Sequence, residues 1–346
     1  MTFLLKVEVG PKIGIGHLKR VEAIQSCFNK RGIDSYISCN SAKAVSTEFN
    51  ESIIEASTES SYENEIIKSS IKFDHVVIDL SHKGSIDHPY KIISYCNYLV
   101  NSNISYSIID GLGDDRLSKF MCFPKCENYF IPYIGSEVLD LTMFNFKNIY
   151  AGSSYAPVNT SINSLKEKKI INALPENILV TCGGSDPHLL TEKILKLLFK
   201  YSSNLNYNKI KVVIGPFYDH RMISDIQSLY TSFNVEFISG LTSLNDQYLW
   251  ADLVITTIGM TRYECLSFNI PFIYFTYGVS PNYEPLLTFN SVLKYSYLGD
   301  LFFNTVNVPS LLQFFTSEEK FRQLSSNCEN VIDLLGAQRI SEALSK

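Results

Sequence analysis

One histidine lies where a side chain could move a proton. His17 follows the two glycines of Gly14-Ile15-Gly16, which allow the backbone to turn sharply and approach a ligand. Apolar residues at helical spacing predict a helix over His17–Arg31, ended by Gly32. The positive end of the helix dipole favours a neutral imidazole, which can accept a proton from water near pH 7. The alternative for such a loop is a histidine that only caps or packs.

Polar side chains at the ends of predicted strands in the first half could serve the same chemistry. They are Asp79, Ser81, His82 and Asp110, and each could contact a sugar hydroxyl or order a water. Taken singly, each also fits an ordinary turn residue. Arg20, in the first turns of the predicted helix, is either a substrate contact or a solvated helix charge.

Two glycine loops in the second half are typical of phosphate binding. Gly183-Gly184-Ser185-Asp186 and Gly259-Met260-Thr261 each lie between a predicted strand and a predicted helix, where backbone N–H groups can bind an anion. Ser185 could donate a hydroxyl or cap the helix. Glu264, three residues after Thr261, fits a capping box or a bidentate acceptor for two ribose hydroxyls. Neither loop is a Walker or a Gly-x-Gly-x-x-Gly motif, so neither ATP nor NAD is indicated.

The elements around these loops alternate between short strands and helices. Continuous apolar strands separated by helices predict two parallel sheets covered on both faces, and ligands of such sheets bind beyond the carboxyl ends of the strands. We expect an N-terminal domain over residues 1–157, a polar linker over 158–175, a second domain over 176–330, and a C-terminal helix over 331–346 that packs back on the first domain. The predicted strands are Phe3–Val9, Ser35–Cys39, His75–Leu80, Ser105–Asp110, Ile178–Cys182, Lys211–Ile214, Val235–Ile238, Leu253–Thr256 and Phe272–Phe275, and the further predicted helices are His188–Tyr201, Arg262–Phe268 and Glu318–Ser345.

The composition narrows the choice of partners. The chain has 346 residues, 45% of them hydrophobic, and a net charge of −5, which argues against nucleic acid. It has no run long and apolar enough for a membrane span, and its first residues predict a strand rather than a signal peptide. The eight cysteines are dispersed, so we expect reduced thiols in a cytoplasmic protein, a monomer or weak dimer, without cofactor or metal. Cys122 and Cys126 are the one pair close enough to suggest a metal, and no second pair lies near them.

Taken together and in this order, the loops resemble those of the UDP-2,4-diacetamido-2,4,6-trideoxy-β-L-altropyranose hydrolases of pseudaminic acid biosynthesis, the PseG family with its SpsG-like relatives. The segments that carry the resemblance are Gly14–Arg20, Val77-Ile78-Asp79, Gly152–Ala156, Cys182–Asp186 and Ile258–Glu264. The family is similar to MurG-type glycosyltransferases, so the resemblance implies a GT-B-like α/β fold, two Rossmann-like domains with parallel sheets facing a central cleft.

The resemblance also implies roles for single residues. His17 matches the catalytic histidine that activates water, and the first domain would bind the sugar of a UDP-sugar with Gly14, Gly16, Arg20, Asp79, Asp110 and Tyr155. The second domain would bind UDP with Gly183, Gly184, Ser185, Gly215, Ile238, Gly259, Met260, Thr261 and Glu264. The sequence departs from the family at Pro157–Ser161, at Asp110-Gly111 and at Asn282–Glu284, positions expected near the sugar. It therefore indicates UDP more specifically than it indicates the sugar. A GT-B glycosyltransferase that moves a sugar to a surface-glycan acceptor remains the alternative, followed by a protein that only binds a nucleotide sugar.

Overall fold

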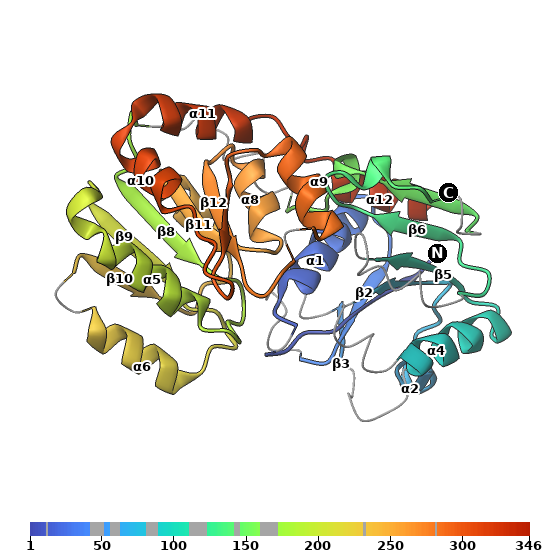
Figure 1. The fold of residues 1–346 in the computed structure, drawn as a ribbon. Helices are drawn as coiled ribbons and strands as arrows, with labels where there is room; N and C mark the ends of the chain where they lie inside the picture. The colour runs from blue at the N-terminus through green and yellow to red at the C-terminus, as the bar shows by residue number, and fades with distance from the viewer. Residues whose placement is uncertain are drawn as a thin grey trace. The chain divides into compact units, whose positions relative to one another are not determined.

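The computed structural model describes residues 1–11, 13–41, 52–55, 63–80, 89–110, 123–141, 146–159, 172–230, 233–280 and 282–346. The chain divides into two compact units (Figure 1). The first comprises Met1–Thr160 together with Asp333–Lys346, and the second comprises Ser161–Ile332. Each unit is built on its own parallel sheet.

The first unit contains a seven-stranded sheet in the order β3-β2-β1-β4-β5-β6-β7, in which every pair is parallel. The strands are β1 (Phe3–Val7), β2 (Ser35–Cys39), β3 (Ile53–Glu55), β4 (His75–Asp79), β5 (Ser105–Ile109), β6 (Asn128–Ile131) and β7 (Asn148–Ala151). The helices are α1 (Gly16–Lys30), α2 (Glu63–Lys68), α4 (Pro89–Asn101) and α12 (Gly336–Leu344), with 3-10 turns η5 (Ser136–Val138) and η6 (Ser153–Tyr155).

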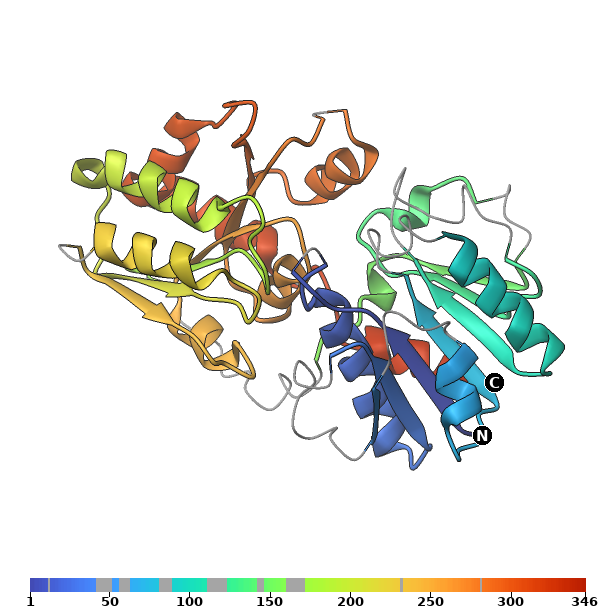
Figure 2. The same ribbon diagram turned by 90° about the horizontal axis from the view of Figure 1, so that it is seen from below.

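Both faces of this sheet are covered, as the continuous apolar strands predict. On one face, α4 packs Tyr95 and Leu99 against Val76 and Ile108. On the other face lies α1, whose Phe28 ring stacks on Phe3 of β1 with centroids 4.5 Å apart. The helix α12 lies beside α1 (Figure 2). Both faces of the sheet are therefore buried under helices. Side chains of this sheet that contact a ligand must then lie at the ends of the strands.

The single predicted helix over Glu318–Ser345 is wrong. The chain forms α11 (Glu318–Cys328) in the second unit and α12 in the first. Between them Asn330 and Leu334 adopt left-handed φ values of 55° and 64°, which an α-helix does not accommodate. Gly336 opens α12 against the backbone of Ala156, and a Cβ there would lie 2.1 Å from the Ala156 carbonyl oxygen.

The second unit contains a six-stranded parallel sheet in the order β10-β9-β8-β11-β12-β13. The strands are β8 (Asn177–Thr181), β9 (Lys209–Val213), β10 (Val235–Ile238), β11 (Leu253–Thr257), β12 (Phe272–Thr276) and β13 (Tyr297–Asp300). The helices are α5 (Leu190–Lys200), η8 (Ser202–Asn204), α6 (His220–Leu229), α7 (Asn245–Trp250), α8 (Thr261–Ser267), α9 (Glu284–Val292), α10 (Val308–Thr316) and α11.

The core on one face of this sheet joins strand residues to α5, α6, α10 and α11, for example Val180 and Ile255 to Leu195 and Phe314. Aromatic contacts join the remaining helices: Tyr274 of β12 meets Phe289 of α9 edge-on, with ring centroids 5.7 Å apart. Where a strand or helix was predicted, apart from the last helix, the structure has one within two residues of the predicted limits. In the part of the chain that the structure describes, no helix is long and apolar enough to cross a membrane.

A buried histidine makes the first unit sensitive to acid. His75 is 2% exposed, and its Nε2 lies 2.8 Å from the Ser107 hydroxyl. Burial lowers the pKa of His75 from 6.5 to about 4. Between these pH values His75 is protonated in the unfolded chain and neutral in the folded unit. The free energy of unfolding therefore falls as the pH drops from 6.5, and the loss is complete below about 4. The difference corresponds to roughly 3 kcal/mol.

His75→Gln is therefore expected to remove most of this acid loss. Urea unfolding at pH 7 and at pH 4.5 should show a smaller decrease in the free energy of unfolding for the variant than for the wild type. His188→Gln, which changes an exposed histidine, is the matched control and should behave as the wild type. Equal pH dependence of all three proteins would contradict the assignment.

Candidate functional site

The glycine loop of the first unit places His17 beside Asp79. His17 is the second residue of α1, and Asp79 is the last residue of β4, the neighbour of β1 in the sheet. Because the strands are parallel, the carboxyl end of β4 meets the loop that leads from β1 into α1. The His17 Nδ1 atom lies 2.7 Å from Asp79 Oδ1.

Asp79 is also held by Arg20. The guanidinium Nη2 donates to Asp79 Oδ1 at 2.6 Å, Nε donates to Oδ2, and Nη1 donates to the hydroxyl of Tyr133, which follows β6. Arg20 is 2% exposed and the Asp79 side chain is 0% exposed. Both residues were expected to contact substrate. In the structure each is buried and hydrogen-bonded to the other, and Asp79 also contacts His17.

The charges of this cluster stabilise one another. Burial alone would raise the pKa of Asp79, but the positive charge of Arg20, with His17 and the hydrogen bonds from both, holds it below its ordinary value. Burial alone would lower the pKa of Arg20, and Asp79 and Tyr133 raise it instead. Near neutral pH the aspartate is therefore an anion and the arginine a cation.

This arrangement orients the imidazole for proton transfer. An ionised Asp79 only accepts hydrogen bonds, so the Nδ1 of His17 carries a proton and Nε2 of the neutral ring is an acceptor. The His17 side chain is 23% exposed, so the ring can reach a ligand or a water. The cluster can accept a proton at Nε2 and stabilise the resulting imidazolium, as a carboxylate does for a catalytic histidine.

The other predicted residues of the first unit lie in different surroundings. Gly14 has a left-handed φ of 81° and pairs with Gly10, which allows the tight turn before His17. Asp110, an expected sugar contact, is 1% exposed and accepts a hydrogen bond of 2.6 Å from the Tyr129 hydroxyl. Tyr155 is partly exposed and packs on Tyr150. Gly16 opens α1, whereas Ser81 and His82 lie outside the described residues.

In the second unit the predicted loops meet at the carboxyl ends of adjacent strands. The loop after β8 contains Gly183 with φ 84°, and the Phe217 amide after β9 donates to the Gly184 carbonyl at 2.9 Å. A Cβ on Gly215 would lie 2.5 Å from the Gly184 oxygen. Gly215 is therefore required for close packing of two loops.

The start of α5 differs from the expected anion site. Ser185 was considered as its cap, but the carboxylate of Asp186 accepts from the amides of Leu190 and Thr191, both at 2.7 Å. These amides are therefore satisfied within the protein. The groups of this loop that could still bind an anion are the backbone amides of Gly183–Ser185, which precede Asp186.

The loop after β11 brings together its predicted residues with one that sequence reasoning missed. Gly259 and Met260 lead into α8, whose first residue is Thr261 and whose fourth is Glu264. The Tyr248 hydroxyl of α7 donates to Glu264 Oε2 at 2.5 Å. Ile238, at the end of β10, is partly exposed. In the sheet, β8 and β9 lie between β10 and β11.

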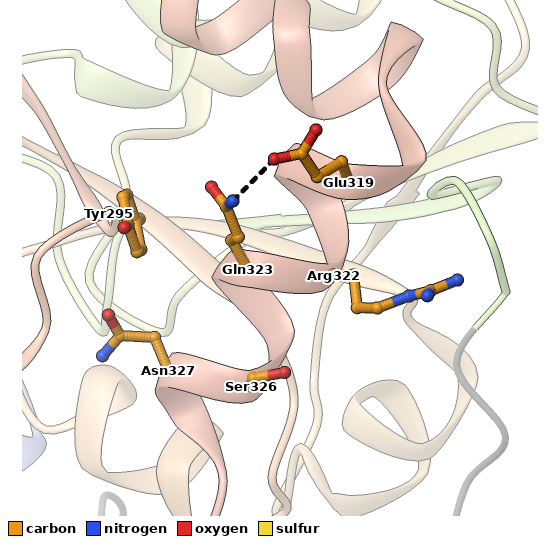
Figure 3. A pocket seen from close by; sticks show the side chains of 6 residues that line it. All are labelled: Tyr295, Glu319, Arg322, Gln323, Ser326 and Asn327. Atoms are coloured by element: carbon orange, nitrogen blue, oxygen red, sulfur yellow. Dashed lines mark hydrogen bonds between the residues drawn. The ribbon is translucent and has the colours of Figure 1, made fainter.

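Figure 3 shows an open hollow of about 480 Å³ along α11. Gln323 donates to Glu319, which lies four residues earlier in the same helix, at 3.0 Å. None of the predicted site residues lines it, so its size carries no assignment. The lining residues are Tyr295, Glu319, Arg322, Gln323, Ser326 and Asn327.

Comparison with known proteins agrees with the architecture. No model of a protein family matches the sequence. An uncharacterised protein of Methanocaldococcus jannaschii is 28% identical over 146 residues, which is 40% of this chain and 30% of that protein, so the chain spans about a third of that relative's length.

Among solved structures, the UDP-GlcNAc 2-epimerase of Neisseria meningitidis bound to UDP-GlcNAc is similar with a TM-score of 0.59 and 18% identity, over 100% of both chains. MurG of Acinetobacter baumannii is similar with a TM-score of 0.58 and 12% identity, over 100% of this chain and 99% of that one. The fold is therefore the expected one: two parallel-sheet α/β units of the GT-B type.

Proposed function

We propose that the protein hydrolyses a UDP-linked amino-deoxy sugar to UDP and free sugar, as part of surface-glycan biosynthesis of the pseudaminic-acid type. The observation that carries the chemistry is the 2.7 Å contact between His17 and a fully buried Asp79, itself held by Arg20. A histidine that only packed would have no need of a buried carboxylate on its Nδ1. The arrangement fits a base whose Nε2 accepts a proton.

In this reaction the oxygen of a water molecule forms a bond to the anomeric carbon while the bond from that carbon to the diphosphate oxygen breaks. His17 accepts the proton of the water, and UDP leaves with the electron pair. Because a nucleoside diphosphate is a good leaving group, a general acid is not essential. Gly14, Gly16 and the partly exposed Tyr155 remain the proposed sugar contacts in the first unit.

The second unit is proposed to bind UDP. The amides of Gly183, Gly184, Ser185, Gly259 and Met260 and the Thr261 hydroxyl would hold the diphosphate, and Glu264 the ribose. Uridine would lie near Gly215 and Ile238. Support comes from the similarly folded epimerase, which was crystallised with UDP-GlcNAc, and from the resemblance of these loops to those of UDP-sugar hydrolases.

The first test is release of UDP from a panel of UDP-amino-sugars in water, without acceptor, with the sugar product followed by NMR. We expect steady release of UDP and free sugar from at least one member, unchanged by a chelator. If the protein bound UDP but released none from any member of the panel, hydrolysis would be overturned and the transferase alternative favoured. The specific observation behind that alternative is the similarity to MurG. Conversion to an epimeric UDP-sugar would overturn both.

A further inference from the structure

Beneath Glu264 lies a buried tyrosine that none of the predicted motifs contains. Tyr248 belongs to α7, sixteen residues before Glu264, and is 1% exposed. Its hydroxyl donates to Glu264 Oε2 at 2.5 Å. The phenol thus holds the side chain that is proposed to bind the ribose.

Glu264 is partly exposed whereas Tyr248 is buried, so the phenol reaches the carboxylate from the protein interior. A carboxylate has two oxygens and about four acceptor positions, so it can accept from Tyr248 and from a ligand at the same time. It can hold a pair of vicinal hydroxyls if it keeps one rotamer. A charge-assisted hydrogen bond from a fixed donor restricts that rotamer.

The ring of Tyr248 is itself held in place. It packs on Phe268, with centroids 5.3 Å apart, and phenylalanine would fill the same space without the hydroxyl. Burial, and next the nearby Glu264 carboxylate, raise the pKa of Tyr248 well above its ordinary value, so the phenol remains a donor throughout the working pH range.

We infer that Tyr248 is a positioning residue that orients Glu264 so that the second unit distinguishes a ribonucleoside diphosphate from one without ribose hydroxyls. This inference rests on the proposed UDP site. It adds a selectivity for the vicinal 2′- and 3′-hydroxyls and assigns it to a side chain that does not contact the ligand.

The test is calorimetric titration of the full-length protein with UDP and with 2′,3′-dideoxy-UDP. We expect Tyr248→Phe to weaken UDP binding about tenfold, because a hydrogen bond to a charged group is lost, and to leave binding of the dideoxy nucleotide unchanged. In a Glu264→Gln background the same substitution should have little further effect, since the two residues act as one unit.

Tyr274→Phe is the matched control, because it removes another buried phenol whose hydroxyl donates at 2.5 Å, in that case to Asn290. It should leave the affinities for both nucleotides as in the wild type. Equal weakening of UDP and dideoxy-UDP in Tyr248→Phe, or no weakening, would overturn the positioning role while leaving the UDP site standing. Failure of the wild type to bind UDP would overturn the UDP site and the inference with it.

Discussion

Replacing His17 with alanine or asparagine is expected to lower turnover of the UDP-sugar about a hundredfold or more, the usual effect of removing a general base. UDP binding should stay at the wild-type level, because the residues proposed for UDP belong to the second unit. Initial rates of UDP release, measured beside calorimetric titration with UDP, separate the two effects.

Asp79→Asn is the companion variant. An amide can present its N–H₂ group to Nδ1 of His17, which would favour the wrong tautomer and place the proton on Nε2. We expect a loss of turnover comparable to that of His17→Asn, with His17 still present. An exposed histidine on the second unit, His188, provides the control: His188→Asn should keep full turnover. Normal turnover in His17→Ala would rule out the base, and normal turnover in Asp79→Asn would rule out its orienting partner.

The strands were predictable because short continuous apolar runs between helices leave little choice of structure. Val76-Val77-Ile78 is such a run, and it forms the buried centre of β4. The break between α11 and α12 was not predictable in the same way. Ile332, Leu334 and Leu335 continue an apolar pattern, whereas the backbone leaves the helix at the extended Glu329 and then passes through the left-handed Asn330 and Leu334.

The site shows the same division between local and long-range information. His17 could be found because its signal, a glycine loop before a helix, is local. Arg20 was expected to be a solvated or a ligand-binding charge, and its burial contradicts the first of these. Its position three residues after His17 puts both on one helix face. Asp79 is 62 residues from His17, so only the parallel pairing of β1 with β4 reveals that they meet. No local pattern marks Tyr133 or Tyr248, whose partners come from other elements.

The burial of Arg20 leads to the largest expected effect on stability. Arg20→Met keeps an unbranched side chain of similar length but leaves the carboxylate of Asp79 buried without its cation. Breaking a buried ion pair from one side costs about 3–5 kcal/mol, because the remaining charge is desolvated and unpaired. The pKa of Asp79 would then rise, since burial would no longer be opposed by Arg20.

The double variant Arg20→Met with Asp79→Asn shows whether the unpaired charge is the cause. It has no buried carboxylate to desolvate, so we expect it to recover a large part of the stability that Arg20→Met loses. Urea unfolding followed by circular dichroism measures both variants. Lys147→Met, which removes the cation of an exposed pair with Glu127, is the control, with an expected change below about 1 kcal/mol. If the single and double variants were equally unstable, lost packing rather than charge would explain the effect. If Arg20→Met were as stable as the wild type, the ion pair would contribute nothing to the fold.

Recovery of stability without recovery of turnover would show that the buried pair serves His17, since the double variant restores the fold but not the carboxylate that orients the imidazole.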